Sequence, residues 1–241
     1  MSIFSLEDSY NGGGIFGLNQ SWTLPLIFAL GLDRAAVSGI GGTGYSSRGT
    51  GPFLIAEERL AAYYNDKGAP NIIVNCNGLN DQGRTGAVSD IKSYYRYASS
   101  IAPDALHISC GAVLPQANQY APQPGYQVVT DAIEDNISAF KNHIFVNPLN
   151  GSITANGEKI VDNSTIQISN NNHPSAMFTG SDFSGSGTAN GNTSLYMGSD
   201  RTHPTVVNTG AASAQLSSGR AYIGNYLFEA VSRAIFSGAM D

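Results

Sequence analysis

The chain has 241 residues, a formal net charge of -6 at pH 7, 41% apolar residues and only 12% charged residues. A chain of this length can bury a sizeable core, and its sequence contains no basic run able to displace counterions from a nucleic-acid backbone. No segment approaches the roughly 20 consecutive apolar residues of a membrane span, so we expect neither a nucleic acid nor a membrane as partner.

Strands and helices are predicted to alternate along the first 146 residues. The predicted strands are residues 3–6, 35–37, 72–76, 105–110 and 144–146, and the predicted helices between them are residues 22–30, 52–64, 88–100 and 126–141. Pro52 would lie in the first turn of the second helix. This alternation predicts an α/β fold with a mainly parallel sheet of about five strands, covered by helices on both faces.

The pattern changes over residues 147–199, where Gly, Asn, Ser and Thr dominate. Two short runs, Ser152 to Thr154 and Thr165 to Ile168, suggest a β-hairpin beside the sheet, with Asn156-Gly157 between them. A last helix over residues 221–236 would close the fold. We therefore expect one domain over residues 1–241, with residues 147–199 as a polar insertion.

Polar residues and glycines follow the first three predicted strands. Ser9 follows the first strand, the glycine-rich segment 39–44 the second, and Gly78-Leu79-Asn80-Asp81 the third. Loops after neighbouring parallel strands meet at the carboxyl edge of a sheet, where α/β folds bind ligands. The three loops are therefore expected to form one site.

A base for this site must come from four histidines. His107 and His143 lie in or beside predicted strands and are expected to be structural, while His173 has no carboxylate in the preceding turn. Asp200 precedes His203 by three residues, so its carboxylate can orient the imidazole, which then accepts a proton from a serine hydroxyl. The alternative is that Asp200 and His203 form only a turn or a helix cap.

Together these pieces resemble the SGNH (GDSL-like) hydrolases. Asp8-Ser9, the Gly-Gly-Thr-Gly segment at 41–44, Gly78-x-Asn80-Asp81 and Asp200-x-x-His203-Pro204 occur in the order and at roughly the spacing of that family's four sequence blocks. The resemblance extends from Asp8 to the final helix. It implies a flavodoxin-like α/β/α sandwich, in agreement with the predicted strand count.

The resemblance also implies roles for individual residues. Ser9 would be the nucleophile, His203 the general base and acid, and Asp200 the residue that orients His203. The backbone N–H groups of Ser9 and Gly42 and the side-chain amide of Asn80 would form the oxyanion hole. Asp8 and Asp81 would be supporting residues, and Asp81 is expected to tie loops together.

The chain departs from the family pattern at Glu7, where the first block normally has glycine. A second carboxylate beside the nucleophile would strain the turn or raise the pKa of His203. Alternatively, Glu7 points away from the site into solvent, and this is the interpretation that we adopt.

The resemblance implies ester hydrolysis through an acyl-enzyme, and the polar insertion favours a carbohydrate substrate over a lipid. Tyrosines such as Tyr10 and Tyr45, with Tyr120 and Tyr196, are candidates to stack on sugar rings. We expect an esterase that removes O-acetyl groups from a polysaccharide, or acts on a small ester. Two alternatives remain: a lipase or thioesterase of the same fold, and a non-catalytic glycan-binding or structural module of a phage tail or surface protein.

The remaining predictions concern metals, cysteines and location. No residue cluster has metal-ligand spacing, so we expect no cofactor and hydrolysis that survives EDTA. Cys76 and Cys110 end predicted strands and are expected to be buried small hydrophobes, with a disulfide between them as the alternative. The low charge favours an extracellular or virion-borne protein, alone or as part of a larger chain or oligomer. The start at Met1 lacks the basic flank of a signal peptide, so we expect either that the protein is not secreted by that route or that the sequence starts inside a longer chain.

Overall fold

The computed structural model of the chain describes residues 1–8, 21, 23–112, 124–149, 151–162 and 219–240. A seven-stranded sheet lies at its centre, with strand order β2-β1-β3-β4-β5-β6-β7. The first five strands are parallel. They are β1 (Ser2–Glu7), β2 (Arg34–Gly39), β3 (Ile72–Asn75), β4 (Leu106–Cys110) and β5 (Asn142–Val146). The predicted mainly parallel α/β sheet is thus confirmed.

The hairpin β6 (Ile153–Ala155) and β7 (Glu158–Val161) extends this sheet. β6 pairs antiparallel with β5, and β7 pairs antiparallel with β6. The turn is at Asn156 and Gly157, which both have positive φ, as the Asn-Gly signal predicted. The partner of β6 is therefore the segment directly after this turn, and not Thr165 to Ile168, which lie outside the described residues.

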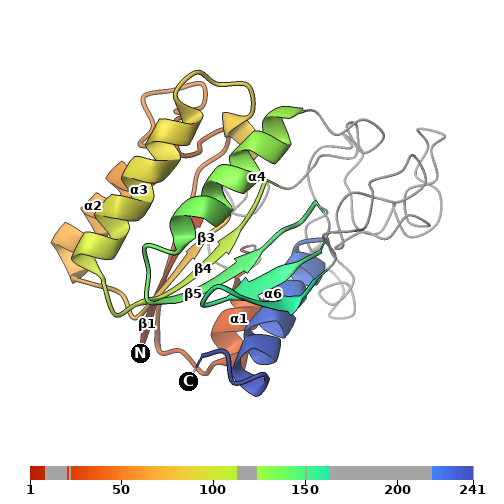
Figure 1. Cartoon of the computed structure of the whole chain (residues 1–241). Helices are drawn as coiled ribbons and strands as arrows, with labels where there is room; N and C mark the ends of the chain where they lie inside the picture. The colour runs from red at the N-terminus through yellow and green to blue at the C-terminus, as the bar shows by residue number, and fades with distance from the viewer. Residues whose placement is uncertain (9–20, 22, 113–123, 150, 163–218, 241) are drawn as a thin grey trace.

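Helices cover both faces of the sheet (Figure 1). One core, which contains Leu26, Val74 and Val231, lies between the sheet and α1 (Leu24–Ala29) and α6 (Gly219–Phe236). The other, which contains Leu6, Ile91 and Ile133, lies under the remaining helices. These are α2 (Ala56–Lys67), α3 (Ala87–Ile101) and α4 (Pro124–Ile137). The result is the three-layer α/β/α arrangement that strand and helix alternation predicts.

Helix α2 begins at Ala56, four residues later than the predicted first turn at Pro52. The Arg48 guanidinium accounts for the difference, because it donates to the Phe53 carbonyl oxygen and holds this segment outside the helix (Nη1 to O, 3.1 Å). The helix then starts where the Glu58 carboxylate accepts a hydrogen bond from the Ile55 backbone N–H at 3.0 Å. A carboxylate in that position caps the free N–H groups of the first turn.

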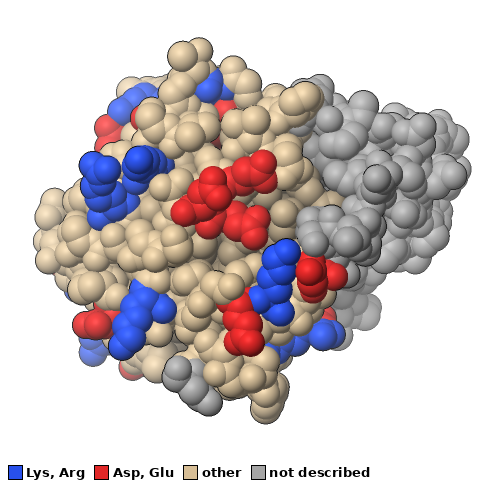
Figure 2. Space-filling view, viewed as in Figure 1, with Lys and Arg blue, Asp and Glu red and all other residues tan. Residues whose placement is uncertain are grey.

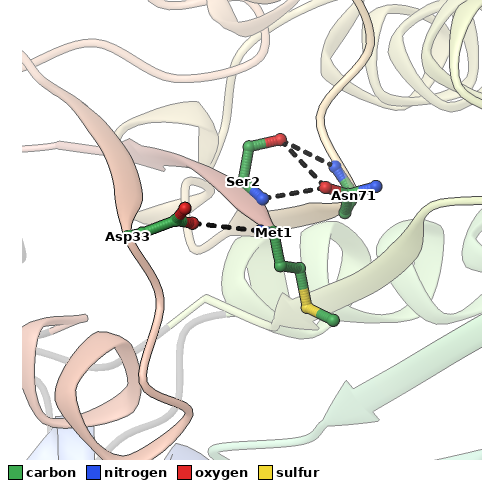
Figure 3. A network of polar contacts seen from close by, with 4 residues as sticks. All are labelled: Met1, Ser2, Asp33 and Asn71. Atoms are coloured by element: carbon green, nitrogen blue, oxygen red, sulfur yellow. Dashed lines mark hydrogen bonds and ion pairs between the residues drawn. The ribbon is translucent and has the colours of Figure 1, made fainter.

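Polar contacts join the first residues of β1 to the segments that precede β2 and β3 (Figure 3). The Met1 ammonium group lies 3.0 Å from Asp33 Oδ1, and the Ser2 backbone N–H donates to Asn71 Oδ1 at 2.8 Å. The Asn71 N–H donates in return to the Ser2 carbonyl oxygen at 3.1 Å. These contacts lie at the amino edge of the sheet, so they align the strands from the end opposite to the loops that carry the predicted site.

His107, His143 and Cys110 lie in strands, and Cys76 directly follows β3. His107 is fully buried, and burial lowers its pKa to about 3, with its Nε2 3.1 Å from the Tyr94 hydroxyl. His143 neighbours it on β5 and is also buried. Cys76 and Cys110 are buried thiols that no disulfide joins, so the alternative of a disulfide is not realised. All four side chains serve the interior of the fold.

The surface in Figure 2 carries few charges. Acidic and basic side chains form small separate groups there, with uncharged surface between them. Within the described part of the chain, no helix combines the length and apolar character that crossing a membrane requires. The same part of the chain contains no group of three His, Cys, Asp or Glu side chains able to hold a metal ion.

Candidate active site

The carboxyl ends of β2, β1 and β3 lie side by side in the sheet. From β1 the chain passes to β2 on one side, and β3 lies on the other side of β1. The order thus reverses at β1, and such a switch point is where open α/β sheets bind ligands. The residues that follow these strands include Asp8, the loop of residues 40–55 and the short 3-10 helix η2 (Leu79–Asp81).

Asn80 connects all three strand ends. Its side-chain nitrogen Nδ2 donates to Asp8 Oδ2 at 3.1 Å and to the carbonyl oxygen of Thr43 at 3.0 Å. Thr43 directly follows Gly42, so the amide expected to bind an oxyanion lies beside the glycine expected to share that role. Nδ2 carries two hydrogens, and an incoming oxyanion would take the place of one of these two acceptors.

The Asp81 carboxylate holds the glycine-rich loop in place through hydrogen bonds. This fully buried carboxylate accepts backbone N–H groups from Tyr45 at 2.8 Å, Ser46 at 2.9 Å and Ser47 at 3.0 Å. A Cβ atom on Gly44 would overlap this carboxylate, so only glycine lets the loop pass so close. The Ser46 hydroxyl also donates to Asp81 Oδ1, at 3.2 Å, so the carboxylate binds both backbone and side-chain donors of the neighbouring loop.

Gly42 adopts a left-handed backbone conformation with φ of 75°. This conformation favours glycine, and a Cβ on Gly42 would lie 3.1 Å from the Cα of Gly49. The Ser47 hydroxyl donates to the Gly42 carbonyl oxygen at 2.6 Å and fixes the peptide. Among the described residues, none accepts a hydrogen bond from the Gly42 N–H.

Glu7 does not point into solvent, and our expectation for it was wrong. It follows Ile3 and Ser5 on the face of β1 that α1 and α6 cover, because alternate residues of a strand face opposite sides. Its Oε1 accepts hydrogen bonds from the hydroxyls of Ser5 at 2.8 Å, Ser21 at 2.6 Å and Thr23 at 2.8 Å. The carboxylate is completely buried.

Tyr45 is also buried, at 1% exposure, so it cannot stack on a sugar ring. Its ring packs edge-on against Tyr94, with ring centroids 5.3 Å apart, and its hydroxyl lies 3.2 Å from that of Tyr95. The Tyr45 backbone N–H is bound by the buried Asp81 carboxylate, and the side chain therefore enters the core under α3. The predicted role of Tyr45 in substrate binding is therefore wrong.

Arg59 is a component of the site that the sequence did not reveal. Its buried guanidinium donates from Nη1 to the carbonyl oxygens of Glu7 at 2.9 Å and Ser38 at 2.7 Å, and from Nη2 to Asn77 Oδ1 at 3.1 Å. Burial lowers its pKa to about 10, although Asp8 and other nearby carboxylates oppose the shift, so it remains charged at neutral pH. One cation thus joins the ends of β1 and β2 to the loop after β3.

The structure therefore brings together Asp8, Gly42, Asn80 and Asp81. Ser9, Tyr10, Asp200 and His203 lie outside the described residues, so the predicted triad remains a prediction. So do the roles of Tyr120 and Tyr196. The described half of the site can donate hydrogen bonds to a developing negative charge, which is the chemistry of an oxyanion hole.

Neither a protein-family model nor a curated protein matches the sequence. Solved structures do resemble the fold. A family 3 carbohydrate esterase from Clostridium thermocellum has 14% sequence identity and a TM-score of 0.54, over 99% of this chain and 98% of that one. A GDSL-like lipase from Parabacteroides merdae has 15% identity and a TM-score of 0.51, over 96% and 95%. At such identities the likeness concerns the fold.

Proposed function

Because the chain has the fold of the GDSL/SGNH lipases and esterases, we propose that it is a serine esterase that removes O-acetyl groups from a carbohydrate. The observation that carries the proposal is the meeting of Asn80, the Gly42 loop and Asp8 at the switch point of the sheet. Of these groups, the Asn80 side-chain amide and the Gly42 backbone N–H are neutral hydrogen-bond donors, which is what a tetrahedral intermediate would need.

In the proposed mechanism, Ser9 Oγ attacks the ester carbonyl carbon while His203 takes its proton, and Asp200 orients the imidazole. The carbonyl oxygen becomes an oxyanion, to which the N–H groups of Ser9, Gly42 and Asn80 donate. Collapse of this intermediate expels the alcohol, which receives the proton from His203. Water, activated by the same imidazole, then releases acetate from the acyl-enzyme.

Two features support a carbohydrate as the alcohol part of the ester. The Clostridium thermocellum structure of the same fold is a carbohydrate esterase. Only 12% of the residues of the chain are charged, and Asn, Ser and Thr are abundant among its uncharged polar residues, which suits a neutral polyhydroxylated ligand.

Turnover of p-nitrophenyl acetate by the wild type and by Ser9→Ala tests the catalytic part of the proposal. We expect Ser9→Ala to lose nearly all activity, while Ser100→Ala, at an exposed position of α3, keeps it. Equal rates for wild type and Ser9→Ala would instead favour a glycan-binding or structural module. A chain-length series from acetyl to palmitoyl esters tests the acyl group, since a preference beyond butyryl would indicate a lipase or thioesterase.

A further inference from the structure

The loop that carries Gly42 also presents an exposed aromatic side chain, Phe53. Phe53 is 41% exposed, and the adjacent Leu54 is 42% exposed. An aromatic ring left in water forgoes the stabilisation that burial gives, so its exposure beside a candidate active site points to a ligand.

Two glycines form the surface behind the Phe53 ring. A Cβ atom on Gly51 would lie 3.0 Å from Cε2 of the ring, and one on Gly49 would lie 3.4 Å from Cδ2. Gly49 in turn adjoins the candidate oxyanion hole, because its Cβ position lies 2.9 Å from the carbonyl oxygen of Gly41. A single glycine thus separates the Phe53 ring from the Gly41-Gly42 peptide.

The backbone of Phe53 is held in place. Arg48 Nη1 donates to the Phe53 carbonyl oxygen at 3.1 Å, and the same guanidinium binds the Glu58 carboxylate at 2.7 and 2.5 Å. A two-point contact between guanidinium and carboxylate fixes direction as well as distance. The backbone that carries the ring is therefore held in place, and a ligand that packs on the ring need not order the loop first.

We propose that Phe53 is a stacking platform for a sugar ring in the alcohol part of the ester. The proposal rests on the proposed function, in which the acyl group is acetyl and its carbonyl lies at Gly42 and Asn80. A methyl group is too short to reach beyond Gly49, so the ring is left for the alcohol part. The C–H face of a sugar is attracted to the negative face of an aromatic ring, and no charge is required.

The kinetic test compares Phe53→Ala and Phe53→Tyr on O-acetylated xylo-oligosaccharides, ethyl acetate and ethyl octanoate. We expect Phe53→Ala to raise KM for the acetylated sugar roughly tenfold with little change in kcat, since the lost contact stabilises substrate and transition state alike. Phe53→Tyr should retain the wild-type KM. Ethyl acetate, whose alcohol part cannot reach the ring, should be unaffected. Phe28→Ala removes a 76% exposed aromatic on α1 and is the matched control.

Three results would overturn the proposal: a KM for the sugar ester within twofold of wild type, an equal loss on ethyl acetate, or a loss confined to ethyl octanoate. Calorimetric titration of the same oligosaccharide into Ser9→Ala and Ser9→Ala/Phe53→Ala separates the platform from catalysis. Weaker binding by the double variant supports the platform even if the wild type proves inactive. Equal binding by both variants refutes the platform even if the esterase activity is confirmed.

Discussion

Replacement of Asp81 by alanine tests whether one buried carboxylate holds the glycine-rich loop. Its Oδ1 accepts the N–H groups of Ser46 and Ser47, and its Oδ2 accepts that of Tyr45. Hydrogen bonds to a charged group contribute about 1.5 to 3 kcal/mol each and do not add fully. Removing the carboxylate leaves three backbone donors in or near the interior, so we expect the free energy of unfolding to fall by about 3 to 5 kcal/mol.

Urea unfolding followed by circular dichroism measures this loss. With a slope near 2 kcal/mol per M, the midpoint should fall by roughly 2 M at an unchanged slope. Asp104→Ala, at an exposed position before β4, should leave the midpoint where it is. A loss below about 1 kcal/mol for Asp81→Ala would refute the argument, because it would mean that the freed N–H groups find water at little cost.

Gly44→Ala tests the same contact from the other side. The added Cβ would overlap the Asp81 carboxylate and displace it, so the single variant should be destabilised nearly as much as Asp81→Ala. In the Asp81→Ala background the carboxylate is absent, and Gly44→Ala should then cost much less. Additive effects of the two substitutions would contradict the packing seen here, since residues in direct contact are expected to couple.

Further predictions concern the oxyanion donor, the buried ions and metal dependence. Asn80→Ala should lower kcat on p-nitrophenyl acetate about 100- to 1,000-fold with little change in KM, and a wild-type kcat would remove Asn80 from the mechanism. Arg59→Met should lower the free energy of unfolding, measured with urea, by about 3 to 5 kcal/mol, and Arg59→Lys should lower it by less. Equal losses for the two variants would show that the charge of Arg59 does not matter. The pKa of His107 is about 3 in the folded protein and 6.5 ordinarily, so only the unfolded chain binds a proton between these values. The contribution of His107 to the free energy of unfolding should therefore be fully present above pH 6.5 and should fall below it by up to about 1.4 kcal/mol per pH unit. Urea titrations at pH 4.5 to 7 should show a flatter pH dependence for His107→Gln. Esterase activity should survive dialysis against EDTA, and loss with recovery on added zinc would contradict a metal-free mechanism.

The fold was predictable because its signals are local. The alternation of strands and helices and the Asn-Gly turn each depend on a few adjacent residues. The meeting of Asp8, Gly42 and Asn80 also followed from the sequence, because parallel strands bring the loops after them to one edge. A short polar motif at the end of each predicted strand was sufficient for that inference.

Buried polar side chains were not predictable, because their partners come from distant segments. Arg59 lies beside Leu60 on α2, and nothing in the sequence distinguishes it from a solvated arginine of a surface helix. Its acceptors at Glu7, Ser38 and Asn77 belong to three different strand ends. The burial of Tyr45 was not predictable either, because it depends on the contact of its backbone with the distant Asp81.

The two adjacent carboxylates Glu7 and Asp8 separate into two environments because a strand alternates its faces. Glu7 lies on the α1 side of the sheet, where hydroxyl groups before that helix bind it, and Asp8 meets the Asn80 amide. The Glu7 side chain is thus accommodated by Ser21 and Thr23, which lie directly before α1. On this account the carboxyl group of Glu7 is bound within the interior, on the face of the sheet opposite to Asp8.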